Sequence, residues 1–274
     1  MFRAIKCYAP SILAAMIVCI YLFPIYWMYA TSFKGPVELM LYPPTLWPTD
    51  PVSNHWDVFN GRNMPRYFWN SIVITAGTLA ITVTFGTGSA YALSLKRNLW
   101  VEVALFSILL MQALPPSLMV TPLFVMFNYV GLLYTPRLAV ILALASKSLP
   151  FYIIICRSAF LGIPKDLREA ALVDGSSNIG VFFWIVIPLA RNAILVAATL
   201  LGIQAMGDYV YSASFIYDQK LQPLTLGLAN YVGVSKTDWA GIMTYSSIMV
   251  TPILLTFMLL QRRLVSGLTA GALK

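Results

Sequence analysis

The residues of this sequence that could carry chemistry are few and widely separated. His55 is the one histidine, and no second metal ligand lies near it in sequence. We read it as a solvated loop residue. An intramembrane enzyme would need a set of metal ligands, or a nucleophile with its base. The sequence offers neither, so we expect neither catalysis nor a metal site. The cysteines show no paired spacing, and we read them as small apolar packing residues: Cys7, Cys19 and Cys156.

The sequence also lacks a nucleotide-binding motif. A Walker A loop needs the pattern Gly-x-x-x-x-Gly-Lys-Ser/Thr, whose backbone amides cradle phosphates. The sequence contains no Gly-Lys pair, so we expect any nucleotide to bind to another chain.

One compact polar segment, at 161–190, stands out between two apolar runs. Pro164 suits the first turn of a helix, and Gly175 can adopt the left-handed conformation that ends one. A second short helix can begin at a polar cap just after this glycine and run to Pro188; its possible caps are Ser176, Ser177 and Asn178. The pattern predicts two short helices joined at a glycine elbow.

The first of these short helices has the features of a docking element. Ala170 and Ala171 give it a low-profile face that can enter a partner's cleft, and Arg168 and Glu169 place charges at its edge. An amphipathic helix lying on lipid headgroups would carry more Lys and Arg and larger apolar residues.

The composition sets the class of protein. Apolar residues make up 59% of the 274 residues and charged residues 10%, and the mean hydropathy is +0.77. Soluble domains of this length do not have such a composition. A membrane span needs about 20 apolar residues, and the sequence has six such runs: 9–32, 70–95, 103–127, 137–160, 191–214 and 240–260. We predict an all-α membrane protein with one transmembrane domain over 1–274.

The Lys and Arg residues predict the orientation. With the N-terminus inside, eleven of the 18 fall in cytoplasmic segments and six in outer loops, as the positive-inside rule requires. Both termini are then cytoplasmic, and the net charge of +8 does not call for a nucleic-acid partner. The outer loop at 34–69, rich in Pro and aromatic residues, predicts an ordered, helix-poor cap.

Polar residues inside the apolar runs suggest a pathway. Lys147 lies well inside the fourth run, where an isolated ammonium is costly, and Asp208 in the fifth run is a possible partner. Gln204 lies one turn before Asp208. These residues form either a structural ion pair or the polar lining of a solute pathway. In the third run Pro115, Pro116 and Pro122 must bend or break the helix, either beside a pathway or as a static kink.

The polar segment resembles a known family. Glu169-Ala170-Ala171, Asp174-Gly175 and Ile185 to Pro188 resemble the EAA loop of permease subunits of bacterial binding-protein-dependent ABC importers. Thr121 to Phe124, Gly131-Leu132 and Thr135, with the tail 261–274, are similar to the carbohydrate-uptake branch, of the maltose-permease second-subunit type. The resemblance covers nearly the whole chain. One departure is Gly207, where such permeases usually carry a polar residue.

The resemblance implies a type I ABC importer permease fold with a cytoplasmic coupling helix, in the bacterial inner membrane. The implied partners are a second permease subunit, two copies of an ABC ATPase that hold ATP and Mg²⁺, and an extracytoplasmic solute-binding protein. The residues implied to dock on the ATPase are Arg168, Glu169, Ala170, Ala171, Leu172, Asp174 and Gly175. The tail residues implied to reach the ATPase interface are Arg262, Arg263, Gly267, Thr269 and Gly271. The expected solute is a sugar, an oligosaccharide or a related polyol or glycoside.

Two other classes stay open on the sequence alone. A secondary transporter would be expected to show repeated halves and paired intramembrane acids, and Asp208 alone is weak support for one. A membrane scaffold that transports nothing is the other alternative.

Overall fold

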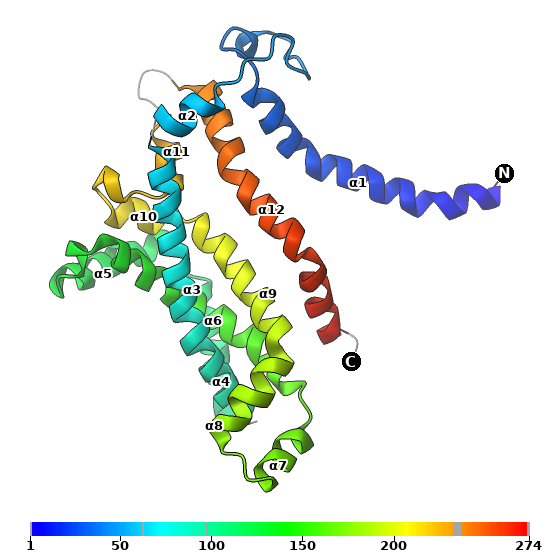
Figure 1. Ribbon diagram of the computed structural model, residues 1–274, viewed down its shortest axis with the longest axis vertical. Helices are drawn as coiled ribbons and strands as arrows, with labels where there is room; N and C mark the ends of the chain where they lie inside the picture. The colour runs from blue at the N-terminus through cyan, green and yellow to red at the C-terminus, as the bar shows by residue number, and fades with distance from the viewer. Residues whose placement is uncertain (1, 62, 97, 233–236, 273–274) are drawn as a thin grey trace. The chain divides into compact units, whose positions relative to one another are not determined.

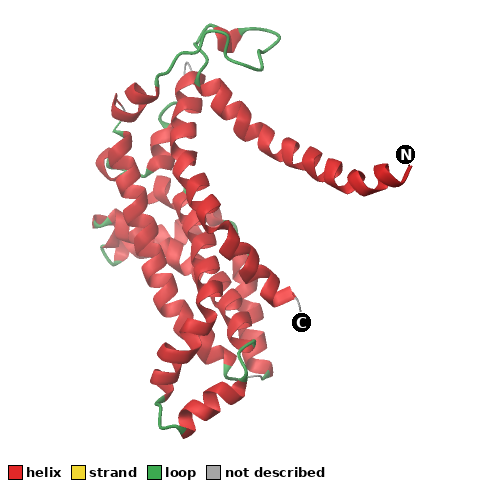
Figure 2. Cartoon of the chain, turned by 45° about the vertical axis from the view of Figure 1, so that its right-hand side comes forward, coloured by secondary structure: helices red, strands yellow, loops and turns green. Residues whose placement is uncertain are grey.

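A computed structural model describes residues 2–61, 63–96, 98–232 and 237–272, with the side chains of 11–61, 63–96, 98–232, 237–259 and 261. The regular structure of these residues is helical (Figures 1 and 2), apart from one isolated antiparallel bridge between Val232 and Thr237. The chain forms two compact units. One contains Met1–Pro65 and Gly227–Leu254, and the other contains Arg66–Leu226 and Leu255–Lys274.

The predicted spans are present, with different ends. Among the described residues five helical stretches are long and apolar enough to cross a membrane, or six if one bent helix pair is counted as a single span. The five stretches lie in or include the following helices: α1 (Phe2–Ser32), α3 (Met64–Ser94), α6 (Pro136–Leu161), α9 (Ile187–Met206) and α12 (Trp239–Ala272). The all-α membrane architecture predicted from composition is confirmed.

The predicted break in the third span is confirmed. Helix α4 (Leu99–Gln112) and helix α5 (Pro116–Tyr129) meet at an angle of 98°. Pro115 has an extended backbone, with φ −65° and ψ 143°, and neither Pro115 nor Pro116 has an N–H to donate to the preceding turn. The helix therefore ends at the two prolines and restarts in a new direction.

The fifth span differs from the predicted 191–214. It starts earlier, because α8 (Asn178–Val181) and a π-helical turn, η3 (Phe182–Val186), run directly into α9. Pro188 has no N–H for the carbonyl of Trp184, so the wider i→i+5 turn replaces an α-helical one at this point. The span also ends earlier, at Met206, and α10 (Val210–Phe215) is a separate short helix.

The second unit packs around α6. The buried residues Val140, Ala143 and Leu144 of α6 contact Ile74 of α3 and Phe215 of α10 in one cluster. Toward the other end of α6, Tyr152 and Cys156 join a second cluster with residues of α3 and α9. The three helices run alongside one another in Figure 1. Cys156 is buried here, in agreement with its predicted packing role.

A fully buried amide ties the loop between α10 (Val210–Phe215) and α11 (Leu224–Ala229) to the helices of this unit. Asn70 of α3 donates to the carbonyl oxygens of Lys220 (3.0 Å) and Gln222 (2.8 Å), and its own oxygen accepts from Arg137 of α6 (2.7 Å). This loop contains η4 (Gln219–Leu221) and leads to α11 (Leu224–Ala229), while η2 (Leu132–Tyr134) joins α5 to α6. One side chain therefore holds three elements in register.

The first unit joins the end of α1 to the first half of α12. The hydroxyl of Tyr29 lies 2.7 Å from that of Thr251, and Thr244 donates to the carbonyl of Ser32 at 3.2 Å. The loop after α1 contains η1 (Glu38–Met40) and α2 (His55–Gly61), with irregular chain between them. The predicted helix-poor segment 34–69 is found only in part, because 34–54 contains a single helical turn whereas 55–61 and 64–69 are helical.

Candidate functional site

The compact polar segment folds as its caps predict. Helix α7 (Lys165–Val173) begins directly after Pro164, and Gly175 has φ +89°. The N–H of Ser176 donates to the carbonyl of Ala171 (3.0 Å) and that of Gly175 to Leu172 (3.1 Å). This is the Schellman arrangement, which needs a left-handed residue at the position of Gly175. The predicted glycine elbow is confirmed, and Ser177 caps α8 by accepting from the N–H of Gly180.

The two alanines of the docking motif lie on different sides of α7. Ala171 is 8% exposed and packs in the second core cluster, whereas Ala170 and Glu169 are exposed. Leu167 and Val173 are 47% and 87% exposed and follow the spacing of Ala170. Residues three apart share a helix face, so Leu167, Ala170 and Val173 form one small apolar stripe that this chain leaves uncovered.

The remaining predicted docking residues also differ in exposure. Arg168 and Leu172 are half-buried, and Asp174 and Gly175 are exposed. The Nε atom of Arg168 is buried without a hydrogen-bond partner among the described residues. For the tail residues Arg262, Arg263, Gly267, Thr269 and Gly271, the backbone continues α12, but their side chains lie outside the described residues.

Aromatic rings that sequence reasoning missed lie behind α7. Tyr91 of α3 stacks on Phe182 with ring centroids 4.9 Å apart, and it meets Phe160 of α6 edge-on at 5.8 Å. Phe160 and Phe182 flank α7 in the sequence. A cluster of aromatic residues near the ends of the predicted second and fourth spans was the signal available for this contact.

The predicted pathway residues are not brought into direct contact. Asp208 accepts from the N–H and hydroxyl of Ser212 at 3.0 and 2.8 Å, so it caps α10. Lys147 is half-buried, and within the described part of the chain the ion pair shorter than 4.0 Å is Arg157–Glu102. The coupling of these two residues stays a prediction.

The environment of Lys147 includes the break in the third span. The side-chain amide of Gln112, the last residue of α4, donates to the carbonyl oxygen of Lys147. Pro150, one turn later in α6, has no N–H and so weakens the helical bonding of this region. Gln204 is exposed on α9. An uncovered amide in a membrane span must face protein or water rather than lipid.

The loop after α1 contains a buried ionic centre. Lys34 is 4% exposed, lies 4.4 Å from the ring centroid of Trp27, and donates to the carbonyl of Thr45. One oxygen of Glu38 accepts from the hydroxyl of Thr45 (2.8 Å) and the N–H of Thr49 (2.9 Å). The hydrogen bond from Thr49 lowers the pKa of Glu38 against the opposing effect of burial, and Thr45 and the charge of Lys34 lower it further.

His55 is not the solvated loop residue that we predicted. Its Nε2 lies 3.3 Å from the hydroxyls of both Ser32 and Ser247, and its ring packs on Phe33 at 4.6 Å. Burial lowers the pKa of this histidine. A lone histidine gave no signal of these partners, because they come from distant parts of the sequence.

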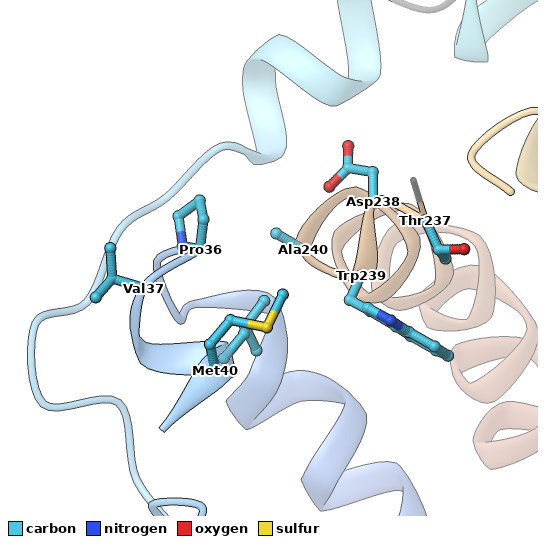
Figure 3. Close-up of a pocket in the computed structure, with 8 residues that line it drawn as sticks. Pro36, Val37, Met40, Thr237, Asp238, Trp239 and Ala240 are labelled. Atoms are coloured by element: carbon cyan, nitrogen blue, oxygen red, sulfur yellow. The ribbon is translucent and has the colours of Figure 1, made fainter. Parts of the chain in front are cut away.

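A cavity of about 620 Å³ lies beside the same loop (Figure 3). Pro36, Val37 and Met40 line one side, and Asp238, Trp239 and Ala240 at the start of α12 line the other. The lining is mainly apolar. Asp238 caps α12 by accepting from the N–H of Gly241 at 2.9 Å, so its carboxylate has a structural role.

Comparison with known proteins gives a consistent result. Residues 82–270 match the family described as "Binding-protein-dependent transport system inner membrane component". The trehalose/maltose transport system permease protein MalG of Thermococcus litoralis is 31% identical over 267 residues, which cover 95% of this chain and 94% of that protein. The sulfoquinovosyl glycerol transport system permease protein SmoH of Agrobacterium fabrum is 31% identical over 255 residues, covering 92% of this chain and 89% of that protein.

Among solved structures, a bacterial ABC transporter involved in the import of the acidic polysaccharide alginate has the same fold. The match has a TM-score of 0.78 at 20% identity and covers 95% of this chain and 97% of the other. The family match extends over more than half of the chain and includes α7. The chain therefore belongs to the family of binding-protein-dependent transport system inner membrane components, as an ABC importer permease with the type I fold.

Proposed function

We propose that this permease imports a saccharide and that α7 couples its movement to an ATPase subunit. The observation that carries the proposal is the uncovered stripe of Leu167, Ala170 and Val173 on a short helix outside the spans. A short helix with small and apolar residues on one face fits a groove of a partner. The fixed glycine elbow presents that face in one orientation.

The saccharide class is proposed from the relatives. The two named permeases belong to transport systems for trehalose/maltose and for sulfoquinovosyl glycerol, and the matching structure imports alginate. A polyhydroxylated solute needs hydrogen-bonding groups along its path. We assign to such a path Gln204 and Lys147 in the spans and Asp208, which lies just after the end of the fifth span.

The proposed assembly contains more than this chain. It has a second permease, two ATPase subunits that bind ATP and Mg²⁺, and an extracytoplasmic binding protein that delivers the solute. Closure of the ATPase pair would rock helix bundles between outward-open and inward-open states, a rigid-body transition. The family description, which names binding-protein-dependent transport, supports the last partner.

One experiment tests this function. The chain is copurified with its partners, the bound solute is identified by mass spectrometry, and ATP hydrolysis is measured in lipid discs with and without the binding protein. We expect a copurifying ATPase, a bound saccharide and stimulated hydrolysis. A complex that forms without any ATPase would contradict the proposal.

We also propose the orientation, with both termini and 161–190 in the cytoplasm. An impermeant thiol reagent should label Ser176→Cys, in a background without the native cysteines, only after the cells are opened. Labelling of Ser176→Cys in intact cells would reverse the topology.

The proposed coupling of Lys147 and Asp208 has its own test. Lys147→Met should impair uptake or assembly because it leaves Asp208 without its attractive charge, and adding Asp208→Asn should restore part of the loss. Two losses that simply add would show that the residues are independent.

A further inference from the structure

Tyr91 lies between the chain segments that lead into and out of α7. Phe160 is one residue before the end of α6 and meets Tyr91 at 5.8 Å with the ring planes 77° apart. Phe182, at the start of η3, stacks on Tyr91 at 4.9 Å with the planes 27° apart. A single residue of α3 thus contacts both flanks of the coupling helix.

The inner face of α7 belongs to the same packed cluster. Ala171 is in one contiguous cluster with Ala90, Phe160 and Val181, and each of these is at most 8% exposed. Tyr91, Leu172 and Phe182 pack against that cluster. Interiors packed at this density transmit displacement, because neighbouring side chains have no free space in which to absorb it.

A second set of contacts fixes α3 to α6 near the same level. The Nε of Arg157 donates to the carbonyl of Leu93 at 3.2 Å, and its Nη2 forms the ion pair with Glu102 of α4 at 2.6 Å. These bonds join α3, α4 and α6, but none of them reaches α8 or η3. The aromatic contact between the exit of α7 and α3 is the stack of Tyr91 on Phe182, and it adds to the packing of Ala90 in the cluster.

The phenol ring, rather than its hydroxyl, makes this link. The Tyr91 ring contacts Phe160 and Phe182, and among the described residues its hydroxyl has no hydrogen-bond partner. The hydrogen bonds from Ser94 and Leu95 are accepted by its backbone carbonyl. Removing the hydroxyl should therefore leave the link intact, whereas replacing the ring with an aliphatic side chain should break it.

We propose that Tyr91 is a positioning residue for energy coupling, whose ring passes the displacement of α7 and α8 to α3. This rests on the proposed function, in which α7 docks on an ATPase. Tyr91 itself contacts neither nucleotide nor solute. Its role is to make the movement of a cytoplasmic helix into a movement of a membrane span.

The test uses the assembled complex with its ATPase, in lipid discs, and needs no knowledge of the solute. A spin label is placed at Ile72→Cys, an exposed position near the outer end of α3, with Cys7 and Cys19 replaced. Spectra are compared without nucleotide and after trapping with ATP and vanadate. Wild type and Tyr91→Phe should show a nucleotide-dependent change.

In Tyr91→Leu the ATPase should still copurify and hydrolyse ATP, but the change at position 72 should be at least about fivefold smaller, the lower end of typical coupling. Phe182→Leu should reduce the nucleotide-dependent change in the same way, because it removes the other ring of the stack. It replaces Tyr91→Leu in the test if the Tyr91→Leu complex fails to assemble. Tyr134→Leu, which alters a tyrosine that is 92% exposed, is the control for a general loss of an aromatic residue.

The outcomes separate the two proposals. A full nucleotide-dependent change in both Tyr91→Leu and Phe182→Leu would overturn the role of Tyr91 and leave the docking of α7 standing. No change in the wild-type complex, or no copurifying ATPase, would overturn the proposed function and the role of Tyr91 with it.

Discussion

The part of segment 161–190 that precedes the fifth span, which begins at Asn178, and the loop 34–63 both lie outside the spans, but different forces order them. Segment 161–190 is held by local signals, since Pro164, the left-handed Gly175 and the Ser177 cap fix its turns. Loop 34–63 is held by buried charge, since Lys34 and Glu38 are almost fully enclosed. One region has a fold set by backbone conformation, and the other has a fold set by hydrogen bonds to ions.

The two regions also differ in the side chains that they expose. Segment 161–190 turns apolar side chains outward on α7 and keeps its buried side for the chain's own core. Loop 34–63 exposes large apolar residues as well, including Val37 at 81% and Tyr42 at 97%, but around an ionic centre. The two regions should therefore respond to different substitutions.

The largest expected effect comes from a bulky residue on the exposed face of α7. Ala170→Trp should leave the fold intact, because the side chain points away from the core, and should block the partner's groove. Losing about 1.4 kcal/mol of docking would weaken the contact about tenfold. ATP hydrolysis stimulated by the binding protein, measured in lipid discs, should fall by at least that factor.

Ala171→Trp is the matched variant one residue away. It overfills the core cluster and should cost about 1–3 kcal/mol of stability, visible as a lower melting temperature before any partner is added. If Ala170→Trp lowered the melting temperature as Ala171→Trp does and left ATP hydrolysis unchanged, the exposed stripe would not be the docking face.

The sequence predicted the first of these regions far better than the second. The class, the six spans and the glycine elbow followed from hydropathy and from cap residues, which act within a few positions. The separate placement of Ala170 and Ala171 did not follow, because it depends on which side of α7 meets the distant residues Phe160 and Val181.

Long-range pairs were missed for the same reason. The partners of Asn70 at 220 and 222, and those of His55 at 32 and 247, are far apart in sequence. The burial of Lys34 was not predictable either, because a lysine directly after an apolar span is expected to lie at the membrane interface. The observed ends of the fifth span differ from the predicted ones because Pro188 permits a π turn and Gly207 stops the helix. Hydropathy alone predicts neither effect.

A second prediction concerns the buried charge in loop 34–63. Lys34→Met should leave the carbonyl of Thr45 without its donor and should destabilise the loop by about 1–3 kcal/mol, the cost of an unsatisfied buried polar group. Amide hydrogen exchange over 34–53 should accelerate, while exchange over 165–190 stays unchanged. Lys220→Met, at an exposed lysine of η4, is the control. Equal exchange over 34–53 in the two variants would mean that Lys34 does not hold the loop.

A smaller effect is expected from Gly175→Ala. No heavy atom lies within 4 Å of the position where the new Cβ would stand, so the cost comes from φ +89° alone and should be about 1 kcal/mol. Gly61→Ala is the matched control, since its Cβ also meets open space and its φ is not in the left-handed range. Thermal unfolding of the two variants should differ by this amount. Equal melting temperatures would show that the elbow tolerates a side chain.

The smallest effect is confined to acid and depends on Glu38. Its pKa is lower in the folded loop than its ordinary value of 4.5, so the unfolded loop binds the proton more readily. The carboxylate therefore contributes stability above about pH 4.5, and that contribution disappears as the pH falls through the lower folded value. Exchange protection over 38–50, divided by the rates of an unstructured peptide at each pH, should decline below about pH 5, in addition to any decline below about pH 6.5 that the lowered pKa of His55 causes in every variant. Glu38→Gln should start from weaker protection and lose this decline, because it has no proton to take up. The same acid profile in Glu38→Gln would place the titrating group elsewhere, and would remove the distinction between a loop ordered by charge and a segment ordered by its caps.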